Sequence, residues 1–578
     1  MANRIVLATT GLAPKWLAGI DSVNGHYPLG LASLHAVAEK AGHQIETLFL
    51  VKEPLERSVE LVRAAVKKMD AQVLGLSIIT DNRTSSFRTI EALHNEFPAI
   101  RIVLGGVHAT VMAEQIITQY PFAVVVLGEG ELTFLDLLDA FETARDLSEV
   151  AGIAYFDGGK VAKTPPRPLI EDLDSLPFPR HDIFYSTDRM AGQLLTSRGC
   201  PYACSFCALD SVSRRKVRRH SVKRVVDEIE KILTDHPQTQ IITIYDDQFF
   251  IDNKRVIEIC DEIVRRGIKS SFSCQGRVKP LSREVVLALE RANFQHVVLG
   301  LESGSPEILE RCHKKIQIAD VERAVKLFAD SDINIQVLLI IGLPGERMAT
   351  VMETVDVCKR LQNIKYHQYD HKVQDLYVYP GTEIYDIYKA AGKIDDDFWL
   401  SDSDCPRFEL ESDNTGYKIL RKMMMDHLNV YRLLTVQGIR AQRDMIPSII
   451  RYMYKPNAFL NLDFLLPVFT AAIERAIVGN RLSFVGETVR PTGDLATFTA
   501  RRKPGSETEL LIGITSFPAD IQWPDLVKTA YLQEITPITH VIDRIFGEFL
   551  EQAVAENDPV LDSTKAWIQA NHWFDLLQ

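Results

Sequence analysis

The sequence contains no cysteine before Cys200 and only eight cysteines in 578 residues. A disulfide framework is therefore not expected, because disulfide-dependent folds are short and rich in cysteine. No apolar run approaches the roughly 20 residues that a membrane-spanning helix requires. The apolar stretch at the N-terminus is too short for a signal peptide and predicts a first strand instead. We therefore expect a cytoplasmic protein without a membrane span.

The chain also lacks an excess of positive charge, since its formal net charge is −12. Proteins bind nucleic acids largely by neutralising phosphates with Lys and Arg, so no nucleic-acid partner is expected. The content of 46% hydrophobic and 25% charged residues is that of an ordinary globular protein. A chain of this length has room for three or four hydrophobic cores.

Three cysteines stand close together in a loop that contains glycine and proline. Cys200, Cys204 and Cys207 follow the spacing C-x3-C-x2-C. Thiolates are the preferred ligands of iron–sulfur clusters, and three of them would hold three corners of one 4Fe–4S cubane, leaving an iron open. The alternatives are three structural thiols or a zinc knuckle, but zinc needs four ligands and the chain offers no partner pair. The other five cysteines are scattered, so we expect a single cluster.

This motif resembles that of the radical S-adenosylmethionine (radical SAM) family. In that family the open iron binds the amino and carboxylate groups of SAM, and an electron from the cluster splits SAM into methionine and a 5′-deoxyadenosyl radical. The resemblance places Phe206 near the adenine. It also implies an electron donor such as flavodoxin or ferredoxin, and a small-molecule or natural-product substrate.

The first 145 residues alternate between expected strands and helices, which predicts a parallel, doubly wound sheet with ligands beyond the carboxyl ends of its strands. The expected strands are 4–9, 45–51, 73–79, 101–104 and 123–127. The expected helices are 29–41, 58–69, 85–96, 111–120 and 132–143.

Glycines follow two of these strands, at Gly105-Gly106 and at Gly128-Glu129-Gly130-Glu131. Each alone is more often a tight turn than a cofactor loop, and neither matches the G-x-G-x-x-G of nicotinamide-binding proteins. Together, and in this order, they resemble the cobalamin-binding domain that precedes many radical SAM cores. The resemblance implies cobalamin contacts at Ser77, Thr80, Gly105, Gly106, His108, Gly128 and Glu129.

The motif D-x-H-x-x-G, which supplies cobalt with a histidine in other cobalamin proteins, is absent. The resemblance therefore implies cobalamin without a protein histidine on cobalt. We expect His108 to lie beside the nucleotide tail of the cofactor. The loop from Thr80 to Arg83 is the candidate for its lower face.

Repeated β/α units from residue 191 onward predict a barrel or partial barrel whose polar strand ends converge on one mouth. Any one of these strand ends could be only a helix cap or a turn, but four in succession indicate a site. By resemblance, SAM would be held at its amino group by Asp246, Asp247 and Gln248, at its carboxylate by Arg277, at its ribose by Glu302 and Ser303, and along its adenine by Gly342, Leu343 and Pro344.

The expected architecture is α/β: a Rossmann-like cobalamin-binding domain (1–145), a proline-rich linker (146–190), a partial TIM-type radical SAM barrel (191–394) and a mostly helical α+β extension (395–578). The extension includes expected strands near 497–502 and 509–514 and would complete the substrate pocket.

The expected activity is that of a cobalamin-dependent radical SAM C-methyltransferase, which moves a methyl group from methylcobalamin to an unactivated carbon. Its cofactors would be a 4Fe–4S cluster, SAM and cobalamin. A cyclase or rearrangement enzyme with the same cofactors is the first alternative. A binding module with a vestigial cobalamin domain is the second.

Overall fold

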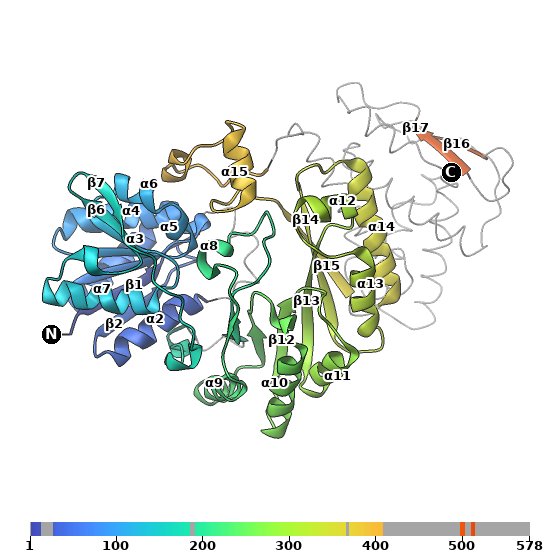
Figure 1. Cartoon of the computed structure of the whole chain (residues 1–578), viewed down its shortest axis with the longest axis horizontal. Helices are drawn as coiled ribbons and strands as arrows, with labels where there is room; N and C mark the ends of the chain where they lie inside the picture. Colours follow the sequence, from blue (N-terminus) through green and yellow to red (C-terminus); the bar gives the residue numbers. More distant parts are fainter. Residues whose placement is uncertain are drawn as a thin grey trace, which may run out of the picture. The chain divides into compact units, whose positions relative to one another are not determined.

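The structure is a computed structural model that describes residues 2–12, 27–184, 191–365, 369–408, 498–502 and 510–514 (Figure 1). The chain forms two compact units, the first comprising Met1–Glu302, Leu309–Pro344 and Ile364–Leu410. The second comprises Ser303–Ile308, Gly345–Asn363 and Glu411–Gln578. Two large sheets belong to the first unit.

The first sheet has seven strands in the order β2-β1-β3-β4-β5-β6-β7. Strands β1 to β5 pair in parallel, as the alternating pattern predicts, whereas β6 and β7 pair antiparallel at one edge. The strands are β1 (Arg4–Thr9), β2 (Gln44–Phe49), β3 (Val73–Ser77), β4 (Arg101–Gly105), β5 (Ala123–Val126), β6 (Ile153–Asp157) and β7 (Lys160–Lys163). The helices are α2 (Leu29–Lys40), α3 (Leu55–Met69), α4 (Arg83–Glu96), α5 (Val107–Val111), α6 (Ala113–Gln119) and α7 (Glu131–Thr143).

Two details differ from the sequence expectation. The helix expected at 111–120 is two helices, α5 and α6, which meet at Met112. The hairpin β6–β7 lies within the stretch expected to be an extended linker. Its strand β6 buries Ile153 and Ala154 against the sheet edge, so apolar burial makes these residues a strand.

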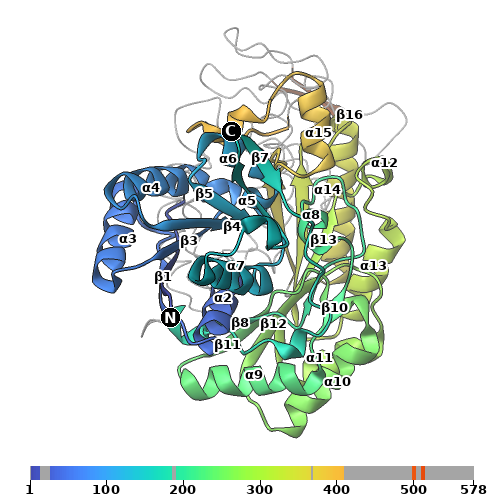
Figure 2. The same cartoon turned by 60° about the vertical axis from the view of Figure 1, so that its left-hand side comes forward.

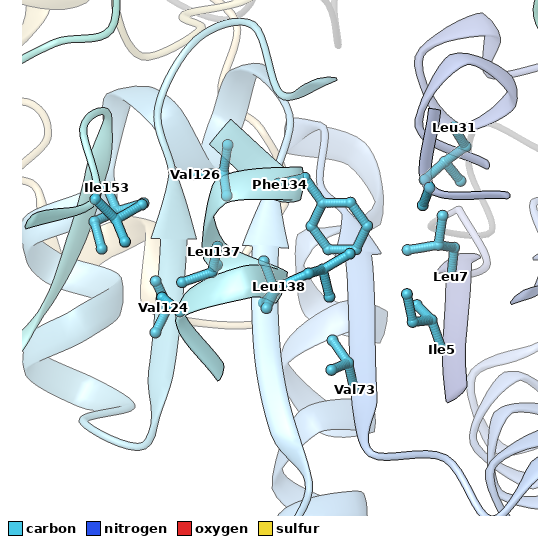
Figure 3. Close-up of a cluster of buried hydrophobic side chains, with 14 of the residues drawn as sticks. Ile5, Leu7, Leu31, Val73, Val124, Val126, Phe134, Leu137, Leu138 and Ile153 are labelled. Carbon is cyan, nitrogen blue, oxygen red and sulfur yellow. The ribbon is translucent and has the colours of Figure 1, made fainter. Parts of the chain in front are cut away.

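Helix α7 is fastened to the first sheet by its apolar face. Phe134 and Leu137 of this helix are buried in one cluster with Leu7 of β1 and Val124 of β5 (Figure 3). Full burial of such a side chain contributes about 1.5–3 kcal/mol. The first turn of α7 is therefore held in place, and with it the glycine turn that precedes it.

The second sheet has six parallel strands in the order β15-β14-β13-β12-β11-β8 and remains open, which confirms the partial barrel. Helices α9, α10 and α11 pack next to one another beside it (Figure 2). The strands are β8 (Ala191–Leu194), β11 (Ile241–Ile244), β12 (Ser271–Gly276), β13 (Phe294–Glu302), β14 (Asn334–Ile341) and β15 (Tyr369–Asp375). The helices are α8 (Asp210–Ser213), α9 (Val222–Asp235), α10 (Asn253–Arg265), α11 (Arg283–Arg291), α12 (Pro306–Arg311), α13 (Ile318–Leu327), α14 (Met348–Ile364) and α15 (Glu383–Ala390).

Beyond residue 408 the structure describes only an antiparallel pair, β16 (Phe498–Arg502) and β17 (Leu510–Ile514), which matches the two strands expected there. The helices expected in the extension lie outside the described residues. In the described part of the chain, no helix combines the length and apolarity needed to cross a membrane.

Candidate cofactor site

A cavity of about 300 Å³ lies at the carboxyl ends of the strands of the first sheet. Five of the seven expected cobalamin contacts line it: Ser77, Gly105, Gly106, Gly128 and Glu129. The lining also includes residues around the cysteine motif, namely Arg198, Gly199, Arg218, His220 and Asp247. All of these residues belong to the first compact unit, so the strand ends and the start of the cysteine loop share one cavity.

Bare backbone forms part of the cavity wall. A Cβ atom added at Gly30, Gly105 or Gly128 would meet no atom within 4 Å, so these glycines leave open space for a ligand. Gly106 is required for another reason: its φ is +96°, and an added Cβ would come within 2.5 Å of the Ile78 carbonyl oxygen. Ligand pockets span roughly 300–1,000 Å³, and this cavity is at the small end of that range. It therefore suits the narrow nucleotide tail of cobalamin better than the wide corrin ring.

His108 lies outside this cavity, although the sequence predicted it beside the nucleotide tail. Its side chain is buried, with Nδ1 3.1 Å from Thr80 Oγ1 and the Trp399 ring packed edge-on at 5.8 Å. Burial lowers the pKa of His108 to about 3, so the imidazole stays neutral at physiological pH. The structure therefore gives His108 a packing position.

The loop predicted at the lower face of the corrin is largely covered. Arg83 is buried and donates hydrogen bonds to the carbonyl oxygens of Thr80, Trp399 and Ser401, at 3.0, 3.1 and 3.3 Å. Thr80 and Arg83 are buried, with Arg83 bonded to the segment around Trp399, and their role at the lower face stays a proposal. Two apolar side chains near the same strand ends, Ile79 and Val107, are 45% and 39% exposed. The sequence does not reveal them, because exposure depends on contacts distant in the chain.

We expect cob(II)alamin bound to this protein to show no axial nitrogen splitting in its electron paramagnetic resonance spectrum. His108 does not line the cavity, and His220, which does, has its Nδ1 2.9 Å from Asp174 Oδ1. His220 also follows the cysteine loop rather than a strand of the first sheet. A nitrogen splitting that disappears in the His220→Gln variant would contradict this expectation.

The cysteine loop connects the two strands of a short ribbon, in which β9 (Ser197–Arg198) pairs antiparallel with β10 (Arg218–Arg219). The three cysteines of the loop are more exposed than the others. Cys200 and Cys204 are half-buried and Cys207 is exposed, whereas the other five cysteines are buried. Among the described residues, no three His, Cys, Asp or Glu side chains are grouped to hold a single metal ion. A cubane needs a wider arrangement, because each thiolate binds a different iron.

Asp246, expected at the SAM amino group, contacts the start of this loop, and its role at SAM stays a proposal. It is fully buried, and its carboxylate accepts hydrogen bonds from Thr196 N and Oγ1 (both 2.5 Å) and from Ser197 N and Oγ (3.1 and 2.6 Å). Burial raises the pKa of Asp246 above its usual value, although the hydrogen bonds from Thr196 and Ser197 act to lower it. We conclude that Asp246 positions the loop.

The next two residues also bind protein groups. Asp247 accepts from Gly199 N at 2.8 Å and lines the cavity. Gln248 accepts from Arg277 N at 2.7 Å and donates to Lys279 O at 3.2 Å. The segment expected to meet SAM therefore sets the positions of the cysteine loop and of Arg277.

Arg277, predicted at the SAM carboxylate, lies beside the cysteine loop, and its role there stays a proposal. Only 6% of it is exposed, its Nη1 lies 3.3 Å from Cys204 Sγ, and its guanidinium stacks 3.8 Å over the Tyr202 ring. Among the residues that the structure describes, its buried Nε and Nη2 find no hydrogen-bond partner. A buried guanidinium with unused donors beside the cysteine loop suits a bidentate carboxylate.

Glu302 ends β13 in the left-handed region, with φ +71°, which is uncommon for a residue with a side chain. Its Oε1 lies 2.7 Å from Lys314 Nζ, and both side chains are buried. The ribose role predicted for Glu302 therefore stays a proposal, with one carboxylate oxygen already engaged.

The remaining predicted SAM contacts lie in the cysteine loop and in the turns that follow β13 and β14. Ser303 belongs to the second unit, where its Oγ lies 3.2 Å from Thr354 Oγ1. Gly342 turns the chain after β14 with φ +96°, Leu343 is buried, and Phe206 is half-buried. Pro344 closes this turn at the end of a first-unit segment. The roles of these residues stay proposals.

Two arginines of the ribbon pair with the glutamates of the glycine turn after β5. Arg198 Nη2 lies 2.7 Å from Glu131 Oε1, and its Nη1 lies 3.4 Å from Glu129 Oε1. Arg218 Nη1 lies 2.7 Å from Glu129 Oε2. Burial opposes ionisation of Glu131, yet Arg198 holds its pKa below the usual value. Glu129 thus binds the ribbon, a contact that its predicted role at cobalamin did not include.

Two family models match this chain: the radical SAM superfamily over residues 194–358 and the B12 binding domain over residues 16–138. An uncharacterized methyltransferase of Pyrococcus horikoshii is 32% identical over 396 residues, which cover 68% of this chain and 83% of the relative. An anaerobic magnesium-protoporphyrin IX monomethyl ester cyclase of Rubrivivax gelatinosus is 29% identical over 360 residues, 60% of this chain and 64% of that one. The solved structure of the cobalamin-dependent S-adenosylmethionine radical enzyme OxsB, with aqua-cobalamin and SAM bound, has a similar fold, with a TM-score of 0.64. The match covers 98% of this chain and 83% of that one, at 16% identity.

Proposed function

The chain belongs to the cobalamin-dependent radical SAM family, and from this premise we propose that it is a methyltransferase acting on an unactivated carbon of a small molecule. Its family defines its cofactors as a 4Fe–4S cluster, SAM and cobalamin. The observation that supports the proposal is the cavity shared by the cobalamin-domain strand ends and the start of the cysteine loop. The 32% identical relative is itself named a methyltransferase.

When bound, the cluster supplies the electron that cleaves SAM, and cobalamin supplies the methyl carrier. The chain contributes binding and positioning. Cys200, Cys204 and Cys207 would hold the cluster, and Arg277 would orient SAM through its carboxylate. Asp246 fixes the loop that carries the cysteines, and the glycine-walled cavity would take the cobalamin tail.

A cyclase is the second candidate, because a magnesium-protoporphyrin cyclase is nearly as similar in sequence, at 29% identity. The two reactions differ in what becomes of SAM. A methyltransferase takes a methyl group from one SAM, leaving S-adenosylhomocysteine, and cleaves another to 5′-deoxyadenosine. A cyclase needs only the second outcome.

The discriminating experiment uses the holoprotein with reductant and methyl-labelled SAM, without added substrate. We expect S-adenosylhomocysteine in an amount equal to the bound cobalamin, with the label retained on the corrin, because this methyl transfer needs no substrate. Absence of S-adenosylhomocysteine, with the label left on SAM, would contradict the methyltransferase proposal and favour the cyclase.

We further propose that the electron donor is an acidic protein such as flavodoxin or ferredoxin. A basic patch, comprising Arg214, Arg215 and Lys216 of one turn and Arg219 of β10, is exposed on a chain whose net charge is −12. This turn touches the cysteine loop, because a Cβ added at Gly199 would come within 2.1 Å of the Lys216 carbonyl oxygen. Opposite charges steer such encounters and make their rates sensitive to salt.

The double variant Arg214→Glu/Lys216→Glu should therefore slow cluster reduction by flavodoxin hydroquinone by roughly tenfold or more at low salt. Stopped-flow absorbance measures this rate. Reduction by the cationic methyl viologen radical should not slow, and Lys254→Glu, an exposed lysine on α10, is the matched control. Equal flavodoxin rates in the wild type and the double variant would reject this docking surface.

A further inference from the structure

The four residues Arg198, Arg218, Glu129 and Glu131 form a contact that we call the arginine–glutamate clasp. The two arginines stand directly opposite each other in the β9–β10 ribbon. Their partners lie about 70 to 90 residues earlier in the chain: Glu129 in the turn that joins β5 to α7, and Glu131 at the first position of α7. The clasp thus joins the cysteine-loop ribbon to the cobalamin-binding domain.

The clasp is largely shielded from water and lies in the wall of the cavity. The side chains of Arg218 and Glu131 are 4% and 6% exposed, and those of Glu129 and Arg198 are 10% and 20% exposed. All four residues line the cavity. Charge pairs in such surroundings depend strongly on geometry, because removing one partner leaves the other buried and uncompensated.

Each end of the clasp is tied to a cofactor site by a few covalent bonds. Arg198 is followed by Gly199 and then by Cys200 of the cluster motif. Glu129 follows Gly128, whose bare backbone faces the cavity. A displacement at either site is therefore passed directly to the charged groups of the clasp.

The glutamates are also held from the cobalamin-domain side. Ser33 Oγ donates to Glu131 Oε1 at 2.9 Å, and Ile170 N donates to Glu129 Oε2 at 3.1 Å. Behind them, α7 is packed into the core by Phe134 (Figure 3). The carboxylates consequently present a fixed receptor to the ribbon, whose other face is held by Asp246 at Ser197 and by Asp247 at Gly199.

We propose that the clasp makes the binding of cobalamin and the binding of the cluster mutually dependent, with Arg198, Arg218, Glu129 and Glu131 as positioning residues. The inference rests on the proposed function only in requiring both cofactors on one chain. An ordered ribbon completes the cavity wall, and an occupied cavity holds the ribbon where the three thiolates can meet the cluster. Such coupling is reciprocal and typically changes an affinity by roughly 5- to 150-fold.

The test compares the dissociation constant of cobalamin for the full chain with and without its cluster, measured anaerobically by absorbance titration. Wild-type protein should bind cobalamin roughly 5- to 150-fold more tightly when the cluster is present. The double variant Arg198→Met/Glu131→Met removes both charges together, which avoids leaving one buried charge unpaired. In this variant the ratio of the two constants should fall toward one. Arg198→Lys keeps the charge and should retain part of the ratio.

A matched control is Arg266→Gln, which disrupts another arginine with several carboxylates, Asp227, Glu230 and Glu262, at 2.7 to 2.8 Å within the barrel helices. This variant should keep the wild-type ratio. A clasp that only stabilised the fold would weaken both cobalamin constants without changing their ratio. A wild-type ratio of one, or a double variant with the wild-type ratio, would overturn the proposal. Since neither substrate nor SAM is present, failure of methylation leaves this result unaffected.

Discussion

Replacement of Cys200, Cys204 and Cys207 by alanine is expected to reduce the iron content of the reconstituted protein from about four per chain to near zero. These three cysteines share one short loop and are half-buried or exposed, whereas the other five are buried. SAM cleavage should be lost with the iron, because the cluster supplies the electron that cleaves SAM. Iron and sulfide analysis, with 5′-deoxyadenosine measured in parallel, checks both expectations.

Cys260→Ala is the matched control, since this thiol is buried in α10 and removed from the motif. It should keep its iron. Corrin should still bind the triple variant, because the glycine-walled cavity does not use the thiols, but more weakly by the roughly 5- to 150-fold coupling proposed above. Unchanged iron in the triple variant would show that the cluster assignment is wrong.

Substitution of Arg277 by methionine is expected to weaken SAM binding by roughly ten- to 100-fold. The estimate follows from losing charged hydrogen bonds worth about 1.5–3 kcal/mol, at 1.4 kcal/mol for each factor of ten. The unused Nε and Nη2 donors of this buried guanidinium are the reason to assign it a ligand. Equilibrium dialysis of labelled SAM against the cluster-loaded protein measures the constant.

Arg277→Lys separates charge from geometry, because an ammonium cannot reproduce the two-pronged guanidinium contact. It should bind SAM with intermediate affinity. Arg277 also contacts Cys204 Sγ at 3.3 Å, so iron must be measured in each variant. A methionine variant with full iron and wild-type SAM affinity would remove Arg277 from the SAM site.

Local sequence signals predicted much of the fold. Ser221 is a residue type that favours the N-cap position of a helix, and its hydroxyl accepts from Arg224 N at the start of α9. The alternation of strands and helices predicted the parallel part of the first sheet and the open barrel. The edge hairpin β6–β7 was missed, because its two short strands stand beside a proline-rich segment and carry no helical or long strand period.

The roles of the polar residues were harder to predict than their positions. Asp246 was correctly placed at a strand end. Its hydrogen-bond partners Thr196 and Ser197 lie about 50 residues earlier in the chain, and their hydroxyl groups donate to its carboxylate. Arg83 is covered by Trp399, more than 300 residues later. Residue type and spacing show where a side chain can act, whereas its partner is decided by tertiary packing.

The central claim is that one chain binds both a 4Fe–4S cluster and cobalamin. The most direct test is to measure iron, sulfide and corrin in the anaerobically reconstituted full chain after gel filtration. We expect about four irons, four sulfides and one corrin for each chain. Protein that keeps its cluster but emerges without corrin, or that keeps corrin but no iron, would contradict the claim.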